Sequence, residues 1–210
     1  MIEIIQMVLG PVMTNAYLVG EKASQQAVVI DPAWDGEQIA EQAEQRGWKI
    51  KELWLTHAHF DHIGGIAGIV RNVQPTPKIA LHAQDVPLYS LQGGAALFGM
   101  RVEAAPAPTI NLQHGQRLIL GKYSFEVRHC PGHTPGHVVF YCIEEKVVFC
   151  GDVIFEGSIG RTDLPGGDYG TLIRSIQSQI LTLPDETRLL SGHGGETSVG
   201  VERRTNPFLS

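Results

Sequence analysis

The fold is decided by residues 50–62, which are Ile50-Lys51-Glu52-Leu53-Trp54-Leu55-Thr56-His57-Ala58-His59-Phe60-Asp61-His62. The first seven of these residues are typical of a buried β-strand. The strand runs directly into four polar side chains, His57, His59, Asp61 and His62. Imidazoles and carboxylates packed this densely are costly to bury unless they serve as partners or ligands. The segment therefore predicts a metal-binding loop at the carboxyl end of a strand.

Three more predicted strands end in the same kind of side chain. Residues 123–128 lead into His129-Cys130-Pro131-Gly132-His133-Thr134-Pro135-Gly136-His137, residues 146–150 into Gly151-Asp152, and residues 188–191 into Gly192-His193. Four loops that each offer an imidazole or a carboxylate indicate one shared metal site. Nitrogen and oxygen ligands suit zinc, manganese or iron, and the scarcity of thiols argues against a closed structural zinc site. His129 and His137 are expected to support this loop, and Cys130 to be structural.

The remaining pattern predicts an α/β fold with two mixed sheets. Further strands are expected at residues 2–9, 15–19, 27–30, 78–81, 117–120 and 138–143. Helices are predicted from a capping box at Asp35 and Gln38 to Gly47, after His62 with an apolar face ending at Val73, and from Asp168 onward. Residues 84–110 are interrupted by glycine and proline, and we expect a helix and a mobile connection that covers a pocket. Each half runs through strands, a helix and a further strand, so helices should cover two facing sheets.

Composition excludes several classes of protein. The chain has 210 residues, 43% of them hydrophobic and 18% charged, which is typical of a soluble globule and predicts one domain over residues 1–210. Its 16 basic and 22 acidic residues give a net charge of −6, which argues against nucleic acid as a partner. The apolar runs are too short to span a membrane. An acidic residue at Glu3 and the odd number of cysteines predict a cytoplasmic protein with reduced thiols.

The ordered set of polar side chains resembles the metallo-β-lactamase superfamily over essentially the whole chain. The resemblance implies an αββα sandwich of two mixed β-sheets with a binuclear metal centre at one edge. It implies that the first metal is held by His57, His59 and His133, the second by Asp61, His62 and His193, and that Asp152 bridges the two. Two divalent ions, zinc first with iron or manganese as alternatives, would share a hydroxide that Asp61 and Asp152 position as catalytic residues.

Within that superfamily, Phe155–Asp163 and Thr134-Pro135-Gly136-His137 resemble the small glyoxalase II-like hydrolases, and so does the tail Glu202–Phe208. This likeness implies hydrolysis of a small-molecule thioester such as S-lactoylglutathione. Arg161 occupies the position of a lysine that contacts glutathione in the larger relatives, and Asp163 occupies the position of a tyrosine. A guanidinium can also bind a carboxylate, so we expect Arg161 to orient the negative end of the substrate. Because the sequence stops at Ser210, we expect no C-terminal helical domain of the kind that supplies further glutathione contacts in those relatives.

Other functions are compatible with the same residues. Persulfide dioxygenases resemble the sequence too, including the stretch Gly160–Asp163, and would use one iron held by His57, His133 and Asp152. A lactonase of the same fold would differ only in its substrates. The absence of an export signal disfavours β-lactam hydrolysis, and the negative charge disfavours RNA processing. A metal-binding module without activity is the last alternative.

Overall fold

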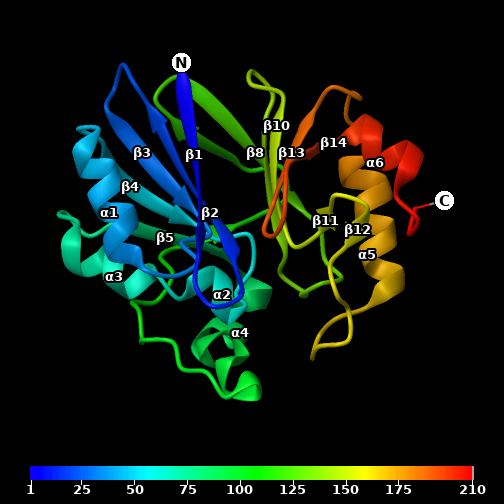
Figure 1. Cartoon of the computed structure of the whole chain (residues 1–210), viewed down its shortest axis with the longest axis horizontal. Helices are drawn as coiled ribbons and strands as arrows, with labels where there is room; N and C mark the ends of the chain where they lie inside the picture. The colour runs from blue at the N-terminus through cyan, green and yellow to red at the C-terminus, as the bar shows by residue number, and fades with distance from the viewer. Residues whose placement is uncertain (210) are drawn as a thin grey trace.

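Two six-stranded β-sheets face each other and helices cover their outer surfaces (Figure 1). The computed structural model describes residues 1–209. In Figure 1, α1 and α3 flank the sheet on the left, and α5 and α6 flank the sheet on the right. This is the predicted αββα sandwich of mixed sheets. No helix among residues 1–209 is long and apolar enough to cross a membrane.

The first sheet has the strand order β1-β2-β3-β4-β5-β6. Its strands are β1 (Ile2–Leu9), β2 (Thr14–Glu21), β3 (Gln26–Ile30), β4 (Lys49–Trp54), β5 (Lys78–His82) and β6 (Ile110–Leu112). The first three strands pair antiparallel, whereas β3 to β6 run parallel to one another. Parallel strands end at the same edge of a sheet, so the segments that follow β3, β4 and β5 meet there.

The second sheet has the order β14-β13-β10-β9-β8-β7. Its strands are β7 (Arg117–Leu120), β8 (Tyr123–His129), β9 (Val138–Cys142), β10 (Val147–Gly151), β13 (Arg188–Ser191) and β14 (Thr197–Ser198). Strands β10 and β13 are parallel, and the other neighbours are antiparallel. A short hairpin of β11 (Ile154–Phe155) and β12 (Ser158–Ile159) follows β10.

The helices are short. They comprise α1 (Gly36–Gln45), α2 (Phe60–Ile63), α3 (Ile66–Asn72), α4 (Val86–Ser90), α5 (Tyr169–Ser175) and α6 (Val199–Thr205). Short 3₁₀-helical segments lie at Ala83–Asp85 and Gln92–Phe98, and a π-helical turn lies at Ile176–Ile180. The predicted start of α5 is confirmed, because the Asp168 carboxylate caps the helix by accepting the Thr171 N–H at 2.7 Å.

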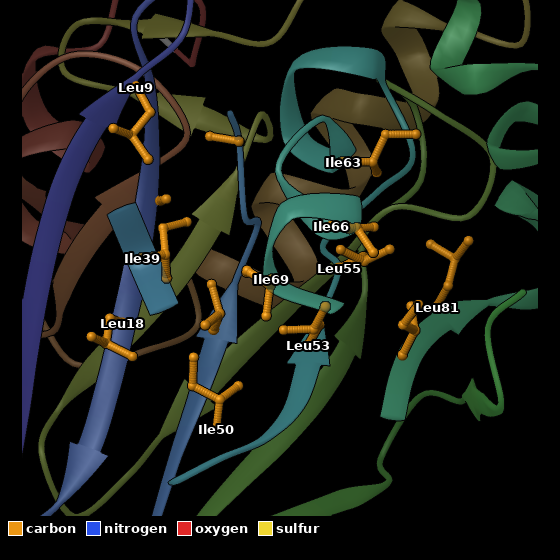
Figure 2. Close-up of a cluster of buried hydrophobic side chains, with 14 of the residues drawn as sticks. Leu9, Leu18, Ile39, Ile50, Leu53, Leu55, Ile63, Ile66, Ile69 and Leu81 are labelled. Carbon is orange, nitrogen blue, oxygen red and sulfur yellow. The ribbon is translucent and has the colours of Figure 1, made fainter. Parts of the chain in front are cut away.

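Three apolar layers hold the sandwich together. The layer between the sheets is centred on Trp54, whose ring lies 5.1 Å from that of Phe125 and 5.6 Å from that of Phe140. A second layer joins the first sheet to α1, α2 and α3, and Figure 2 shows Ile39, Ile66 and Ile69 packed toward the sheet. The third layer packs the second sheet on α5 and α6. Strands buried on both faces explain the near-continuous apolar runs in the sequence.

The capping box predicted at Asp35 does not form. Asp35 precedes α1 in a left-handed conformation with φ of 47°, and its side chain makes no capping hydrogen bond. The turn is closed instead by the Gln38 N–H, which donates to the Asp35 carbonyl at 2.9 Å. A residue that caps a helix with its side chain typically has an extended backbone. The left-handed backbone of Asp35 does not provide that geometry.

The helix predicted after His62 begins three residues earlier, at Phe60, and is divided. Asp61 and His62 lie inside α2, and α3 starts only at Ile66. The break falls at Gly64 and Gly65, where the backbone of the loop after β3 packs closely and the Gly65 N–H donates to a carbonyl of that loop at 3.0 Å. A side chain at either glycine would collide with this loop, so tertiary packing interrupts the helical periodicity.

Residues 84–110 contain more regular structure than the sequence predicted. They form part of the single-turn segment Ala83–Asp85, then α4 and the segment Gln92–Phe98, before an extended run into β6. Four further elements were not predicted from the sequence: β6, β14, α6 and the β11–β12 hairpin. All four elements are short, and their pattern is too brief to separate from a loop.

Candidate metal centre

The predicted ligands gather at one edge of the sandwich, near α2 in Figure 1. His57 and His59 follow β4, while Asp61 and His62 lie on α2. His133 lies in the loop after β8, Asp152 directly after β10, and His193 two residues after β13. The structure thus brings together all seven side chains that the sequence singled out.

These side chains fall into two trios that share one neighbour. The ligand atoms of His57, His59 and His133 lie within 4.8 Å of one another, and so do those of Asp61, His62 and His193. Asp152 lies between the trios, with Oδ1 3.3 Å from His62 Nε2 and Oδ2 3.6 Å from both His133 Nε2 and His193 Nε2. This is the donor set that suits two divalent ions with a shared carboxylate.

The unpaired atoms of the cluster fit a metal centre. His57 Nε2, His62 Nε2 and Asp152 Oδ1 are buried and make no well-aligned hydrogen bond with the described residues, although His62 Nε2 and Asp152 Oδ1 lie 3.3 Å apart. The opposite nitrogens of the rings are held, since His133 Nδ1 lies 2.8 Å from the Arg161 carbonyl oxygen and His62 Nδ1 lies 3.0 Å from Asp31 Oδ2. Histidines that bind metal show this arrangement, with one nitrogen held by an oxygen and the other presented to the ion.

The pKa values of most of these groups are shifted toward the protonation states that bind a cation. Burial lowers the pKa of His57 well below its usual range, and burial together with His133 lowers the pKa of His59 to about 3. Burial would raise the pKa of Asp61, but His62, His193 and Thr14 together outweigh it and the pKa falls to about 2. Metal binding requires neutral imidazoles and ionised carboxylates, so these three groups are in the correct state at neutral pH.

His62 behaves differently because three carboxylates surround it. Burial opposes its charge, but Asp61, Asp152 and Asp31 together hold the pKa of His62 well above its usual range. Asp152 shows the reciprocal effect: despite burial, His62 and its neighbours keep the pKa of this carboxyl below its usual range. The imidazolium stabilises the clustered negative charge that a metal ion would otherwise balance.

Two partners of the cluster were missed in the sequence. Asp31 accepts hydrogen bonds from the Thr56 N–H at 2.7 Å and the Thr56 hydroxyl at 2.6 Å, in addition to its contact with His62. The Thr14 hydroxyl donates to Asp61 Oδ2 at 2.8 Å. Asp31 directly follows β3, so a carboxylate at the end of an apolar strand was the available signal. Thr14 offered none.

Asp85 is a third residue that the sequence did not reveal. Its buried carboxylate accepts hydrogen bonds from the Ala58 N–H at 3.0 Å, the Thr134 hydroxyl at 2.8 Å and the Gly136 N–H at 2.6 Å. Ala58 lies between His57 and His59, and Thr134 follows His133. Asp85 therefore joins the two loops that contribute the first trio.

Replacing Asp85 with alanine should weaken metal affinity roughly 10–100-fold, the usual effect of losing a partner that orients metal ligands. Asp85→Asn keeps one acceptor and should lose less. Glu103→Ala is the matched control, since Glu103 lies in the same segment and is exposed. Competition with a chromophoric chelator measures the affinity. An affinity equal to that of the Glu103 variant would show that the loops hold their geometry without Asp85.

The residues near the ligands take supporting positions. His137 is fully buried, stacks on His57 with ring centres 4.6 Å apart, and accepts the Asp152 N–H at Nε2. His129 is outside the cluster and contacts the Pro135 carbonyl oxygen at 2.9 Å. Cys130 is buried, and burial raises the pKa of its thiol, which makes it a poor nucleophile.

Arg161 lines a pocket beside the cluster, together with Asp61, His133 and Asp152. Its guanidinium already forms a bidentate pair with Asp163, with Nε 2.8 Å from Oδ1 and Nη2 2.7 Å from Oδ2. Both side chains are exposed. The predicted anion-binding group is thus at the predicted place but holds a carboxylate of its own chain.

Comparison with known proteins identifies the family of the chain. The family model of the metallo-β-lactamase superfamily matches residues 9–193. The chain belongs to the metallo-β-lactamase superfamily. The chain is thus an enzyme of a metallo-hydrolase superfamily, and its His/Asp cluster could hold a metal ion.

Two relatives resemble the chain over most of its length. It is 40% identical to the "probable metallo-hydrolase YqgX" of Bacillus subtilis, covering 98% of this chain and 96% of the relative. It is also 40% identical to the "hydroxyacylglutathione hydrolase GloC" of Haemophilus influenzae, covering 88% of this chain and 87% of that protein.

Two solved structures have the same fold throughout. The BLEG-1 B3 metallo-β-lactamase superposes with a TM-score of 0.91 at 38% identity, covering 100% of both chains. The protein TTHA1623, solved in a di-iron-bound form, superposes with a TM-score of 0.89 at 42% identity, covering 98% of this chain and 100% of the other.

Proposed function

We propose that this chain is a metal-dependent hydrolase of glutathione-type thioesters, with S-lactoylglutathione as the first substrate to test. The observation that carries the proposal is the pair of ligand trios with Asp152 between them. The likeness to the hydroxyacylglutathione hydrolase supports the substrate class, and the likeness to the di-iron protein supports two ions. Zinc, iron and manganese all suit these ligands.

In this proposal one ion would be held by His57, His59 and His133. The other would be held by Asp61, His62 and His193, and Asp152 would be available to both. When bound, the ions would acidify a water and polarise the thioester carbonyl. The overall reaction consumes one water, breaks the C–S bond, and releases a carboxylic acid and a thiol. Asp61 and Asp152 act as oriented ligands, and the Thr14 hydroxyl fixes the carboxylate of Asp61.

Arg161 is proposed to face the anionic part of the substrate. Its guanidinium lies at the pocket but is paired with Asp163, so a substrate carboxylate would have to replace Asp163 as its partner. A guanidinium forms the same bidentate bonds with either carboxylate, so the exchange loses no hydrogen bond.

The test is thiol release from S-lactoylglutathione by protein reconstituted separately with zinc, iron and manganese, with metal content measured on the same samples. We expect about two ions per chain, as a binuclear site requires, and one thiol for each thioester consumed. The protein adds little background, because Cys130, Cys142 and Cys150 are all buried. Chelator-treated protein is the control.

Other outcomes identify the alternatives. Oxygen uptake with glutathione persulfide at one iron per chain would contradict the hydrolase and assign a dioxygenase. Turnover of lactones without thioesters would assign a lactonase. The structural likeness to BLEG-1 B3 metallo-β-lactamase adds a β-lactam to the panel. Fully loaded protein that is inactive on every substrate would contradict an enzymatic role.

A further inference from the structure

The pocket beside the metal ligands has an unusual lining. Apart from the candidate ligands and Arg161, every residue that lines it is apolar: Val12, Phe60, Phe98, Met100 and Leu164. These side chains come from the β1–β2 turn, from α2, from the segment around Gln92–Phe98 and from the loop after Arg161. Four separate parts of the chain thus build one apolar wall next to the reacting centre.

We propose that this wall is the acyl subsite, and that it selects short aliphatic acyl groups over hydroxylated ones. This inference rests on the proposed thioester hydrolase and names the acyl half of its substrate. Phe98 is the main specificity-determining residue. It is 42% exposed, and its ring centre lies 5.2 Å from that of the buried Phe60.

The lining decides between the two kinds of acyl group. A substrate hydroxyl that leaves water needs a hydrogen-bond partner, and an unpaired one carries a desolvation cost. The apolar wall provides no hydroxyl, amide or free charged side chain for that purpose. A methylene placed against Phe98, Met100 or Leu164 instead gains from leaving water.

The size of the pocket limits what enters it. Its volume is about 190 Å³, which is below the ~300 Å³ at which pockets begin to enclose a drug-sized ligand. A short acyl chain fits such a space, whereas the thiol half of a glutathione thioester must extend outward. Arg161 is the one charged residue of this lining that is not a candidate ligand, and it is exposed, so it could contact the anionic part of that thiol half.

The first experiment compares S-propionylglutathione with S-lactoylglutathione, which differ by one hydroxyl, using the metal-loaded protein. Rates are divided by those of the hydroxide-catalysed reactions to remove intrinsic reactivity. We expect a higher kcat/KM for propionyl, and a rise of about fourfold for each methylene from acetyl to butyryl. A higher normalised kcat/KM for lactoyl, or no dependence on chain length, would overturn the inference.

Phe98→Ala tests the assigned residue. We expect kcat/KM for S-butyrylglutathione to fall roughly tenfold, while that for S-acetylglutathione changes by less than about twofold because the acetyl group presents too little apolar surface to reach Phe98. Leu97→Ala is the matched control, because Leu97 is the neighbouring residue, is 69% exposed and does not line the pocket. Equal losses on both substrates, or an effect of Leu97→Ala as large as that of Phe98→Ala, would contradict the role of Phe98.

A binding measurement separates failure of this inference from failure of the proposed function. Butanoate and lactate are titrated into the zinc-loaded protein while the methyl resonance of Met100 is followed by NMR. We expect butanoate to shift Met100 at several-fold lower concentration than lactate, with the exposed Met13 unchanged. Equal or tighter binding of lactate would overturn the acyl subsite. If no thioester is hydrolysed, the thioesterase proposal fails while this titration still tests the pocket.

Discussion

Replacing His133 with alanine is expected to remove both bound metal and turnover. The side chain is buried, its Nδ1 is held by the Arg161 carbonyl oxygen, and its Nε2 lies 2.8 Å from His59 Nδ1. The substitution removes one ligand of the first trio and leaves a hole where an ion would be held. The loss should exceed the roughly 10–100-fold that follows removal of a supporting partner. Metal content after desalting and thiol release from the substrate measure the two effects.

His114→Ala is the control for this variant. His114 is exposed and lies outside the ligand cluster, so its loss should leave both metal content and turnover unchanged. Circular dichroism must show that the His133 variant is folded. Robust hydrolysis by a folded His133→Ala protein would contradict the proposed metal centre, whatever its metal content.

Replacing Trp54 with alanine should lower the free energy of unfolding by about 3–5 kcal/mol, the usual cost of removing a large aromatic side chain from a core. Trp54 is fully buried between the sheets and contacts Phe125 and Phe140. Its indole N–H donates to Glu52 Oε2 at 2.7 Å, a bond that is lost as well. For a chain of this length, the midpoint of thermal unfolding should fall by roughly 6–20 °C.

Two variants serve as controls for the stability of Trp54→Ala. Trp54→Phe keeps part of the ring contacts and should lose less stability than Trp54→Ala. Ile119→Ala removes an apolar side chain that is 63% exposed on the second sheet, and should change the free energy by no more than about 0.5 kcal/mol. Urea unfolding compares all three. A loss below about 1 kcal/mol for Trp54→Ala would mean that the two sheets do not depend on this contact.

Most of the sheet structure could be predicted because the strands are apolar, and central strands such as β2, β9 and β10 are buried on both faces. The predicted boundaries of the strand at Ile2–Leu9 are confirmed without change, and those of Arg188–Ser191 as well. The helix boundaries were less accurate where packing overrides periodicity, as at Gly64 and Gly65. Short edge elements such as β6 and β14 were missed because three or two residues carry too little pattern.

The sequence by itself determined which chemistry is available. Imidazoles and carboxylates that follow apolar strands can be recognised from their neighbours in the sequence. The ends of parallel strands must meet at one edge of the sheet. Only the tertiary structure decided how these groups are supported. Asp31, Asp85 and Thr14 bind partners that lie 25 to 51 positions away in the chain. Such contacts depend on how the sheets and loops pack, so local pattern cannot predict them.

The apolar pocket is also a feature that the tertiary structure decides and the sequence does not. Val12, Phe98 and Leu164 are ordinary apolar residues in three loops, and nothing near them in the sequence relates one to another. The sequence likewise placed Arg161 at the site but not its bidentate pairing with Asp163. Ligand identity is a property of single residues and short spacings, and it can be predicted from them. The shape and polarity of a pocket arise from side chains that meet only when the two sheets are packed together, and for that reason they required the structure.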